Sequence, residues 1–79
     1  MEYDKEKVDE VVLALMSLVL HGDSAEVRAW KGFDWDTLDR LHAKGLISDP
    51  RSKAKSVALS DKAVELAEKL FEKHFGIKG

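Results

Sequence analysis

The feature of this sequence that most constrains its fold is VVLALMSLVL, residues 11–20, which is apolar at every position but Ser17. The apolar residues recur at helical spacing and predict a helix from about Asp4 to Leu20. They form two adjacent stripes, one of Val8, Val11, Val12, Leu15 and Val19 and one of Leu13, Met16 and Leu20. A helix that is apolar nearly all round is buried on several sides. The rest of this short chain, or a second copy of it, must therefore cover the helix.

The size and composition of the chain limit what else can hold it together. Residues 1–79 are predicted to form a single domain near the lower size limit of independent stability. The chain has no cysteine, which excludes disulfides and thiolate metal sites. Its acidic N-terminus is unlike a secretory signal, and the apolar run is too short to span a bilayer, which takes about 20 residues. We therefore expect a soluble, cytoplasmic protein. A membrane role is not expected either, because neither amphipathic helix carries the lysine-rich polar face that binding to a membrane surface prefers.

A second helix is predicted from about Trp35 to Lys44, because the sequence carries signals for both of its ends. Asp34 is a favourable N-cap residue, and Gly45 suits the left-handed position that follows the last turn. Two apolar pairs agree with this register, namely Phe33 with Leu38 at the start and Leu41 with Leu46 at the end.

The two tryptophans are interpreted differently. The spacing within the second helix places Trp35, Leu38, Leu41 and His42 on one face and Thr37, Arg40 and Lys44 on the opposite face. The apolar face is predicted to be buried, so Trp35 is expected to fill the core rather than to serve as a ligand platform. Trp30 lies outside the helix, and the sequence leaves it open between core, interface and exposed surface.

The segments around this helix are predicted from shorter patterns. Residues 24–33 alternate apolar and polar positions, which favours an extended segment over the alternative of a helical turn capped by Ser24. Residues 46–48 and 56–60 are typical of two strands that form a hairpin around the turn signal Asp49-Pro50.

Glycine and serine residues mark the ends of the other two helices. The first helix is expected to end at His21-Gly22-Asp23, with Gly22 as a left-handed cap. The last helix is predicted from about Asp61 to Phe75, with Ser60 as its N-cap and Gly76 at its end. The residues after Gly76 are expected to be frayed.

Taken in order, these elements predict an α+β fold of three helices and a small antiparallel β-hairpin. The segment from Leu38 to Leu70 resembles the second half of a winged helix-turn-helix domain. The residues that carry the resemblance are Leu38, Leu41, Gly45-Leu46-Ile47, the tip from Arg51 to Lys55, and Leu59-Ser60-Asp61-Lys62-Ala63. The resemblance implies a winged-helix-like domain. In two departures from the pattern, Ala63 stands where glycine is common, and there is little room before residue 34 for a further helix.

Over nearly its whole length the chain also resembles a family of small bacterial proteins of unknown function. The stretches that carry this resemblance are RAWKGFDWDTLDRLHAKGLISDP, residues 28–50, and KAKSV, residues 53–57. The resemblance implies a bacterial cytoplasmic domain without catalysis and supplies no activity.

DNA binding is the function that the winged-helix resemblance raises. It would place residues 35–44 in the major groove, with possible nucleic-acid contacts from Arg40, Lys44, Arg51, Lys53 and Lys55. Residues 23–39 hold five acids against two bases, however, and the net charge of −2 gives no general attraction to DNA. Three phosphate contacts from the hairpin tip would give a salt slope of only about −2.7, which means weak binding.

Protein association is the other function class that the sequence supports. A second copy could cover the first helix, but a monomer in which the hairpin and last helix cover it is equally compatible with the pattern. The candidate interface residues are Leu13, Met16, Leu20 and Trp30. We therefore predict a non-enzymatic interaction module, homodimeric or bound to a protein partner, with a weak or partner-assisted DNA-binding regulator as the alternative.

Catalysis is not expected. The three histidines are far apart in sequence, and there is no phosphate-binding glycine loop or nucleophile elbow. His21 and Asp23 are too few ligands for a zinc site. No catalytic residue, metal, cofactor or small-molecule substrate is predicted.

Overall fold

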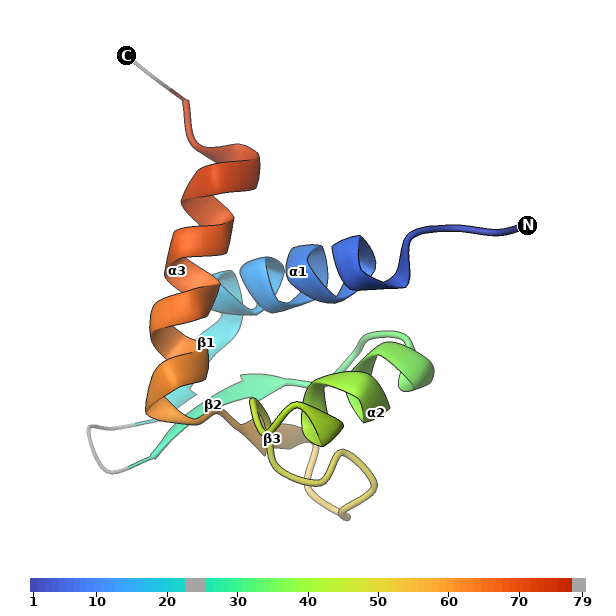
Figure 1. The fold of residues 1–79 in the computed structure, drawn as a ribbon. Coiled ribbons are helices and arrows are strands. Elements are labelled where there is room, and N and C mark those ends of the chain that lie inside the picture. The colour runs from blue at the N-terminus through green and yellow to red at the C-terminus, as the bar shows by residue number, and fades with distance from the viewer. Residues whose placement is uncertain (23–25, 78–79) are drawn as a thin grey trace.

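The computed structural model describes residues 1–22 and 26–77, and in this part of the chain three α-helices accompany a small antiparallel sheet (Figure 1). In chain order the elements are α1 (Lys5–Met16), a 3-10 turn η1 (Ser17–Val19), β1 (Leu20–Gly22), β2 (Val27–Trp30), α2 (Trp35–Ala43), β3 (Ser56–Ala58) and α3 (Asp61–Phe75). In Figure 1, α1 and α3 cross one another above the sheet, and α2 lies lower, beside it. The predicted α+β fold is confirmed.

The sheet has three strands in the order β1-β2-β3, and both pairs are antiparallel. The predicted hairpin of residues 46–60 is present in a reduced form. Its second strand is β3, whereas its first strand contributes one bridge, between Ile47 and Leu59, and a hydrogen bond from the Ser48 N–H to the Ala58 carbonyl oxygen at 2.9 Å. The main partner of β3 is β2, which the sequence predicted as extended but left without a partner.

The first helix ends earlier than its apolar pattern predicted. α1 stops at Met16, and the Ser17 hydroxyl donates to the Ala14 carbonyl oxygen at 2.6 Å, a local bond that competes with a continued helix. Leu20 then pairs with Ala29 in the sheet, which holds the chain extended. Tertiary pairing therefore takes the last residues of the apolar run out of the helix.

Several local predictions fall on the segment after η1. The expected helix end at His21-Gly22-Asp23 is wrong for residues 21–22, which belong to β1, although Gly22 does have a positive φ of 108°. Asp23 and the alternative cap Ser24 lie outside the described residues, as do Lys78 and Gly79 of the predicted frayed end.

The predicted ends of α2 and α3 are confirmed by their hydrogen bonds. The Asp34 carboxylate accepts from the Thr37 N–H at 3.1 Å, and the Ser60 hydroxyl oxygen accepts from the Ala63 N–H at 3.1 Å. At the end of α2, Gly45 has a φ of 76°, and the N–H groups of Gly45 and Leu46 donate to the carbonyl oxygens of His42 and Leu41 at 2.9 and 3.1 Å. This is the predicted Schellman ending.

The core lies between the helices and the inner face of the sheet. Its buried apolar side chains are Leu13, Ala14, Met16, Ala29, Leu38, Leu41, Leu46, Ile47, Val57, Leu59, Ala63, Ala67 and Leu70. Every described α-helix and strand supplies at least one of them except β1, whose Leu20 packs against the cluster. The apolar stripe that contains Leu13 and Met16 is therefore covered within one chain.

The buried face of α2 is rotated from the predicted one. Leu38 and Leu41 are buried as predicted, but the flank that turns inward is Thr37, at 0% exposed, whereas Trp35 is 49% exposed. The prediction that Trp35 fills the core is therefore wrong, and His42, on the same flank, is also exposed. The two leucines fix only the middle of the buried face, and contacts with α1 decide which flank turns inward.

The arrangement is winged-helix-like from β2 onward, where a strand, a helix, a short hairpin and a closing helix follow in order. Only residues 31–34 separate β2 from α2, so this part of the chain has no room for the helix that precedes a recognition helix. The helix-turn-helix is truncated, as its sequence predicted.

Candidate functional site

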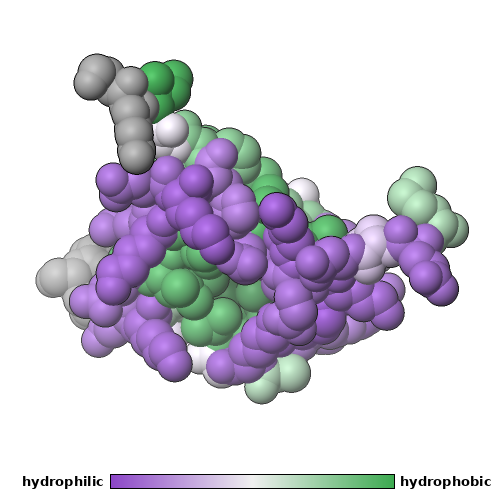
Figure 2. All heavy atoms as spheres, turned by 45° about the horizontal axis from the view of Figure 1, so that its top comes forward, coloured by the Kyte–Doolittle hydropathy of each residue, from purple (hydrophilic) through white to green (hydrophobic). Residues whose placement is uncertain are grey.

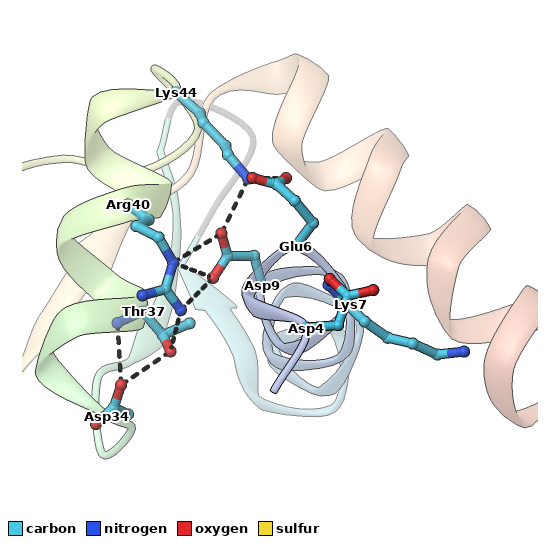
Figure 3. Close-up of polar contacts among 8 residues, drawn as sticks. All are labelled: Asp4, Glu6, Lys7, Asp9, Asp34, Thr37, Arg40 and Lys44. Atoms are coloured by element: carbon cyan, nitrogen blue, oxygen red, sulfur yellow. Dashed lines mark hydrogen bonds and ion pairs between the residues drawn. The ribbon is translucent and has the colours of Figure 1, made fainter. Parts of the chain in front are cut away.

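A buried carboxylate joins α1 to α2 (Figure 3). Asp9 is 2% exposed, and Arg40 binds it through Nε at 2.8 and 3.1 Å and through its terminal nitrogen Nη2 at 2.8 Å. The Lys44 ammonium reaches the same carboxylate at 2.9 Å and Glu6 at 2.7 Å. The two cations that were predicted to face DNA are therefore engaged with α1.

Thr37 fixes the other side of the Arg40 guanidinium. The Thr37 hydroxyl donates to Asp34 at 3.0 Å and accepts from Arg40 Nη2 at 3.1 Å, as Figure 3 shows. The N-cap of α2 and the buried Asp9 thus belong to one network, and this network explains why Thr37 rather than Trp35 turns inward. We call Asp9, Arg40 and Lys44 the α1–α2 ion cluster.

The protonation of the cluster follows from these contacts. Burial by itself raises the pKa of Asp9, but the hydrogen bonds and charges of Arg40 and Lys44 outweigh burial and hold this pKa below its ordinary value. The bond to Asp9 raises the pKa of Arg40, and bonds to Glu6 and then Asp9 raise the pKa of Lys44. The cluster is therefore ionised at neutral pH.

The loop after α2 is fastened to the exposed side of that helix. Arg51 binds Asp39 at 2.7 and 3.3 Å and lies over the Trp35 ring, with its guanidinium carbon 4.9 Å from the ring centroid. The Lys31 ammonium donates to the carbonyl oxygens of Pro50 and Ser52 at 2.8 and 2.7 Å and lies 5.9 Å from the same ring. Trp35 therefore acts as a surface support for this loop.

Of the five predicted nucleic-acid contacts, Arg40, Lys44 and Arg51 are paired with acids within the chain. Lys53 and Lys55 are exposed, and neither side chain makes an ion pair or hydrogen bond within the described part of the chain. The structure brings Arg40 and Lys44 together on the α1 side of α2. Arg51 belongs to the loop on the other side.

Trp30 lies on the outer face of the sheet. Its ring stacks on His21 of the neighbouring strand with centroids 4.4 Å apart, and it is still 54% exposed. On the same face, Arg28 donates to the hydroxyl and carbonyl oxygens of Ser56 at 2.7 and 2.8 Å. The ring is thus held in a defined orientation while much of it faces solvent.

The predicted interface residues separate into buried and accessible ones. Leu13 and Met16 are 1% and 0% exposed, so neither can contact a second molecule in this fold. The prediction that these two residues belong to an interface is therefore wrong. Leu20 is partly buried against the core, and Trp30 remains accessible.

The other stripe of α1 is the accessible one. Val8, Val11 and Leu15 are partly exposed and Leu18 is 66% exposed, and none of the four belongs to the core cluster or packs against it. We call Val8, Val11, Leu15 and Leu18 the α1 seam.

Apolar side chains also line a hollow between the three helices. Figure 2 shows apolar surface in the middle of this side of the molecule, framed by polar side chains. A pocket of about 100 Å³ here is lined by Asp9, Glu10, Leu13, Leu41, Lys44, Leu46, Leu66 and Leu70. Its volume suits one aliphatic side chain.

Residues 1–22 and 26–77 contain no group of three histidine or acidic side chains placed to hold a metal ion. In the same part of the chain, no helix is both long and apolar enough to cross a membrane.

Sequence reasoning missed Asp9 and Leu18. Asp9 continues the buried stripe of Leu13 and Met16 at helical spacing. An acid in a buried stripe needs a cationic partner, and Arg40 and Lys44, four residues apart on one helix, offer one. Leu18 was missed because the helix was expected to continue to Leu20 and to be buried on several sides.

Comparison with known proteins places the chain in a family. Residues 4–77 match the family model described as "Domain of unknown function (DUF6429)". The chain is 51% identical, over 95% of its length and 97% of the other protein, to "Uncharacterized protein y4hR" of Sinorhizobium fredii, a bacterium. No solved structure matches it. The predicted membership in a small bacterial family of unknown function is confirmed, and the chain belongs to the DUF6429 family.

Proposed function

We propose that this protein is a non-catalytic module that binds another protein chain. The observation that supports this most directly is the exposure of two large apolar side chains, Leu18 at 66% in the turn after α1 and Trp30 at 54% in the sheet. Single exposed apolar residues are common on folded proteins. Here Leu18 continues a row of partly exposed apolar side chains on α1, and the Trp30 ring is oriented by His21. Oriented aromatic and aliphatic side chains are typical anchors of protein interfaces.

Site-specific photo-crosslinking in the bacterial host tests this proposal. A photoreactive amino acid would replace Leu18 or Trp30 in one set of variants and the exposed Glu68 or Lys62 of α3 in a control set. We expect a discrete crosslinked protein band from one of the first two positions, with identity established by mass spectrometry, and none from the controls. Equal labelling of all four positions, or of none, would count against a protein-binding role.

A DNA-binding regulator is the second candidate, and one observation favours it. Lys31 and Arg51 fasten residues 50–52 in place, so the neighbouring Lys53 and Lys55 have no acid partner in the described structure at the end of a supported loop. The surface of α2 opposes this role, because Asp36 is exposed there and Asp39 already binds Arg51.

A titration of duplex DNA at several salt concentrations separates the two candidates. Two phosphate contacts give a slope of log K against log salt of about −1.8. For a regulator, the slope should be at least this steep, and the Lys53→Glu, Lys55→Glu double variant should no longer bind the duplex. Absence of binding at low salt would rule the regulator out for the isolated chain.

A further inference from the structure

The α1 seam is the apolar surface whose geometry points to one occupant. Its four residues, Val8, Val11, Leu15 and Leu18, are separated by three, four and three positions. This is the spacing of the a and d positions in a coiled coil, where a narrow apolar row of one helix packs against another helix. Leu18 lies in the 3-10 turn that directly follows α1, and its position three residues after Leu15 continues the spacing of the row.

The order of the seam residues favours a second copy of the same helix. The spacing of three, four and three is the same in both directions, and valines occupy the first half and leucines the second. In an antiparallel pair, Val8 therefore meets the second copy's Leu18, and Val11 meets its Leu15. A two-fold axis repeats both contacts, as an isologous interface requires. Each contact joins a smaller side chain to a larger one, which fills space evenly along the pair.

The charges of the chain favour the antiparallel orientation. Residues 1–10 carry five acids and two bases, and within the chain Lys44 and Arg40 compensate part of this charge at Glu6 and Asp9. A parallel pair would bring two acidic N-terminal segments together, whereas an antiparallel pair separates them by the length of the seam. Antiparallel alignment also opposes the two helix dipoles.

We propose that two copies of this chain associate through the α1 seam, in antiparallel orientation about a two-fold axis. The proposal rests on the proposed protein-binding function and names its partner. A seam of four side chains is small compared with the interfaces of permanent dimers, so the association is weak and reversible. The core that holds α1 in place is complete in each copy, and each copy therefore folds without the other.

Sedimentation analysis tests the association. The purified full chain would be measured at concentrations up to about 1 mM, because a dissociation constant above that value marks negligible affinity. We expect the average mass to rise from one chain toward two. Leu18→Glu should keep the mass at one chain throughout, and its circular dichroism should remain that of the wild type because Leu18 is exposed. The matched control is Ile77→Glu, an apolar side chain that is 94% exposed outside the seam, which should still dimerise.

Disulfide trapping tests the orientation, and the natural absence of cysteine leaves no background. Chains with Val8→Cys and chains with Leu18→Cys would be mixed in a thiol redox buffer. The antiparallel pair predicts a mixed dimer as the main product, in which position 8 of one chain is joined to position 18 of the other. A parallel pair predicts the two homodimers, since positions 8 and 18 lie about 15 Å apart along a helix.

The outcomes separate this inference from the proposed function. A single-chain mass up to about 1 mM, or a dimer that Leu18→Glu leaves intact, overturns the seam dimer. Preferential homodimeric disulfides overturn its orientation. If the chain is monomeric but crosslinks to a different protein in the host, the seam dimer fails and the protein-binding function stands. If both experiments are negative, both fail.

Discussion

Replacing Asp9 with asparagine should cost this protein a large part of its stability. The side chain is 2% exposed and has two cationic partners, so the variant leaves Arg40 and Lys44 at a neutral group. Removing one member of a fully buried ion pair costs about 3–5 kcal/mol. Arg40 and Lys44 keep 24% and 37% of their side-chain surface exposed and so regain some hydration, which lowers our estimate for Asp9→Asn to about 2–3 kcal/mol.

This loss is easily measured in a chain of this length. Total stability is about 0.05–0.15 kcal/mol per residue, or about 4–12 kcal/mol for 79 residues. Urea unfolding followed by circular dichroism, with a slope of about 1 kcal/mol per molar, should show the midpoint falling by about 2 M or more. The thermal midpoint should fall by about 10–20 °C.

The pH dependence of the free energy of unfolding provides an independent test of the same prediction. The pKa of Asp9 is lowered in the folded state, so the unfolded chain binds more protons in acid. The contribution of Asp9 is therefore fully present above its unfolded pKa of about 3.9 and is lost as the pH falls through the lower folded value. Asp9→Asn should flatten this acid limb of the stability curve.

Asp39→Asn is the matched control, because Asp39 also has a lowered pKa, through its bond to Arg51, but lies at the surface. Its unfolding midpoint should stay close to that of the wild type, since exposed ion pairs contribute little. If Asp9→Asn unfolded at the same urea concentration as Asp39→Asn, with an unchanged acid limb, the assignment of Asp9 as a buried structural charge would be refuted.

Three further predictions follow from the same contacts. Replacing Asp9 and Arg40 together with leucine should recover part of the stability lost by Asp9→Asn, because the buried carboxylate and the arginine that neutralises it are then removed together; urea unfolding of the three proteins measures this. Trp35→Ala should leave the unfolding midpoint nearly unchanged but speed amide hydrogen exchange in residues 49–53, because Arg51 and Lys31 lose the ring that supports them. Gly22→Ala should destabilise the protein more than Gly45→Ala. Both glycines have a positive φ, but only at Gly22 would the new β-carbon collide with a backbone atom, the Glu26 carbonyl oxygen. Thermal unfolding of both variants tests this order.

Much of the local structure could be predicted from the sequence. The ends of α2 and α3 follow from contacts between residues three to five positions apart, such as Asp34 with Thr37 and Leu46 with Leu41. These interactions need no distant partner, so the residues that make them can be recognised in the sequence. The truncation before α2 was predictable for a similar reason, because the number of residues available is a property of the chain.

The candidate site was less predictable, because it depends on pairs that are distant in sequence. Asp9 and Arg40 are separated by 31 positions, and no local pattern shows that their helices pack together. Arg40 and Lys44 were therefore assigned to the exposed side of α2, and Trp35 to the buried side. Leu38 and Leu41 are compatible with either flank of α2 turning inward. The buried Asp9 carboxylate on α1 favoured the flank that carries Arg40 and Lys44, because these two cations neutralise it.

The sequence by itself determined that this chain forms three helices, where α2 and α3 begin and end, and that α1 must be buried on more than one side. Only the tertiary structure decided that the apolar run leaves α1 after Met16 through a 3-10 turn and enters the sheet at Leu20, that β2 has partners on both sides, and that both tryptophans face solvent. The physical reason is the range of the interactions. Caps and apolar spacing act within a few residues, whereas strand pairing and the solvation of a buried charge depend on groups that only folding brings together.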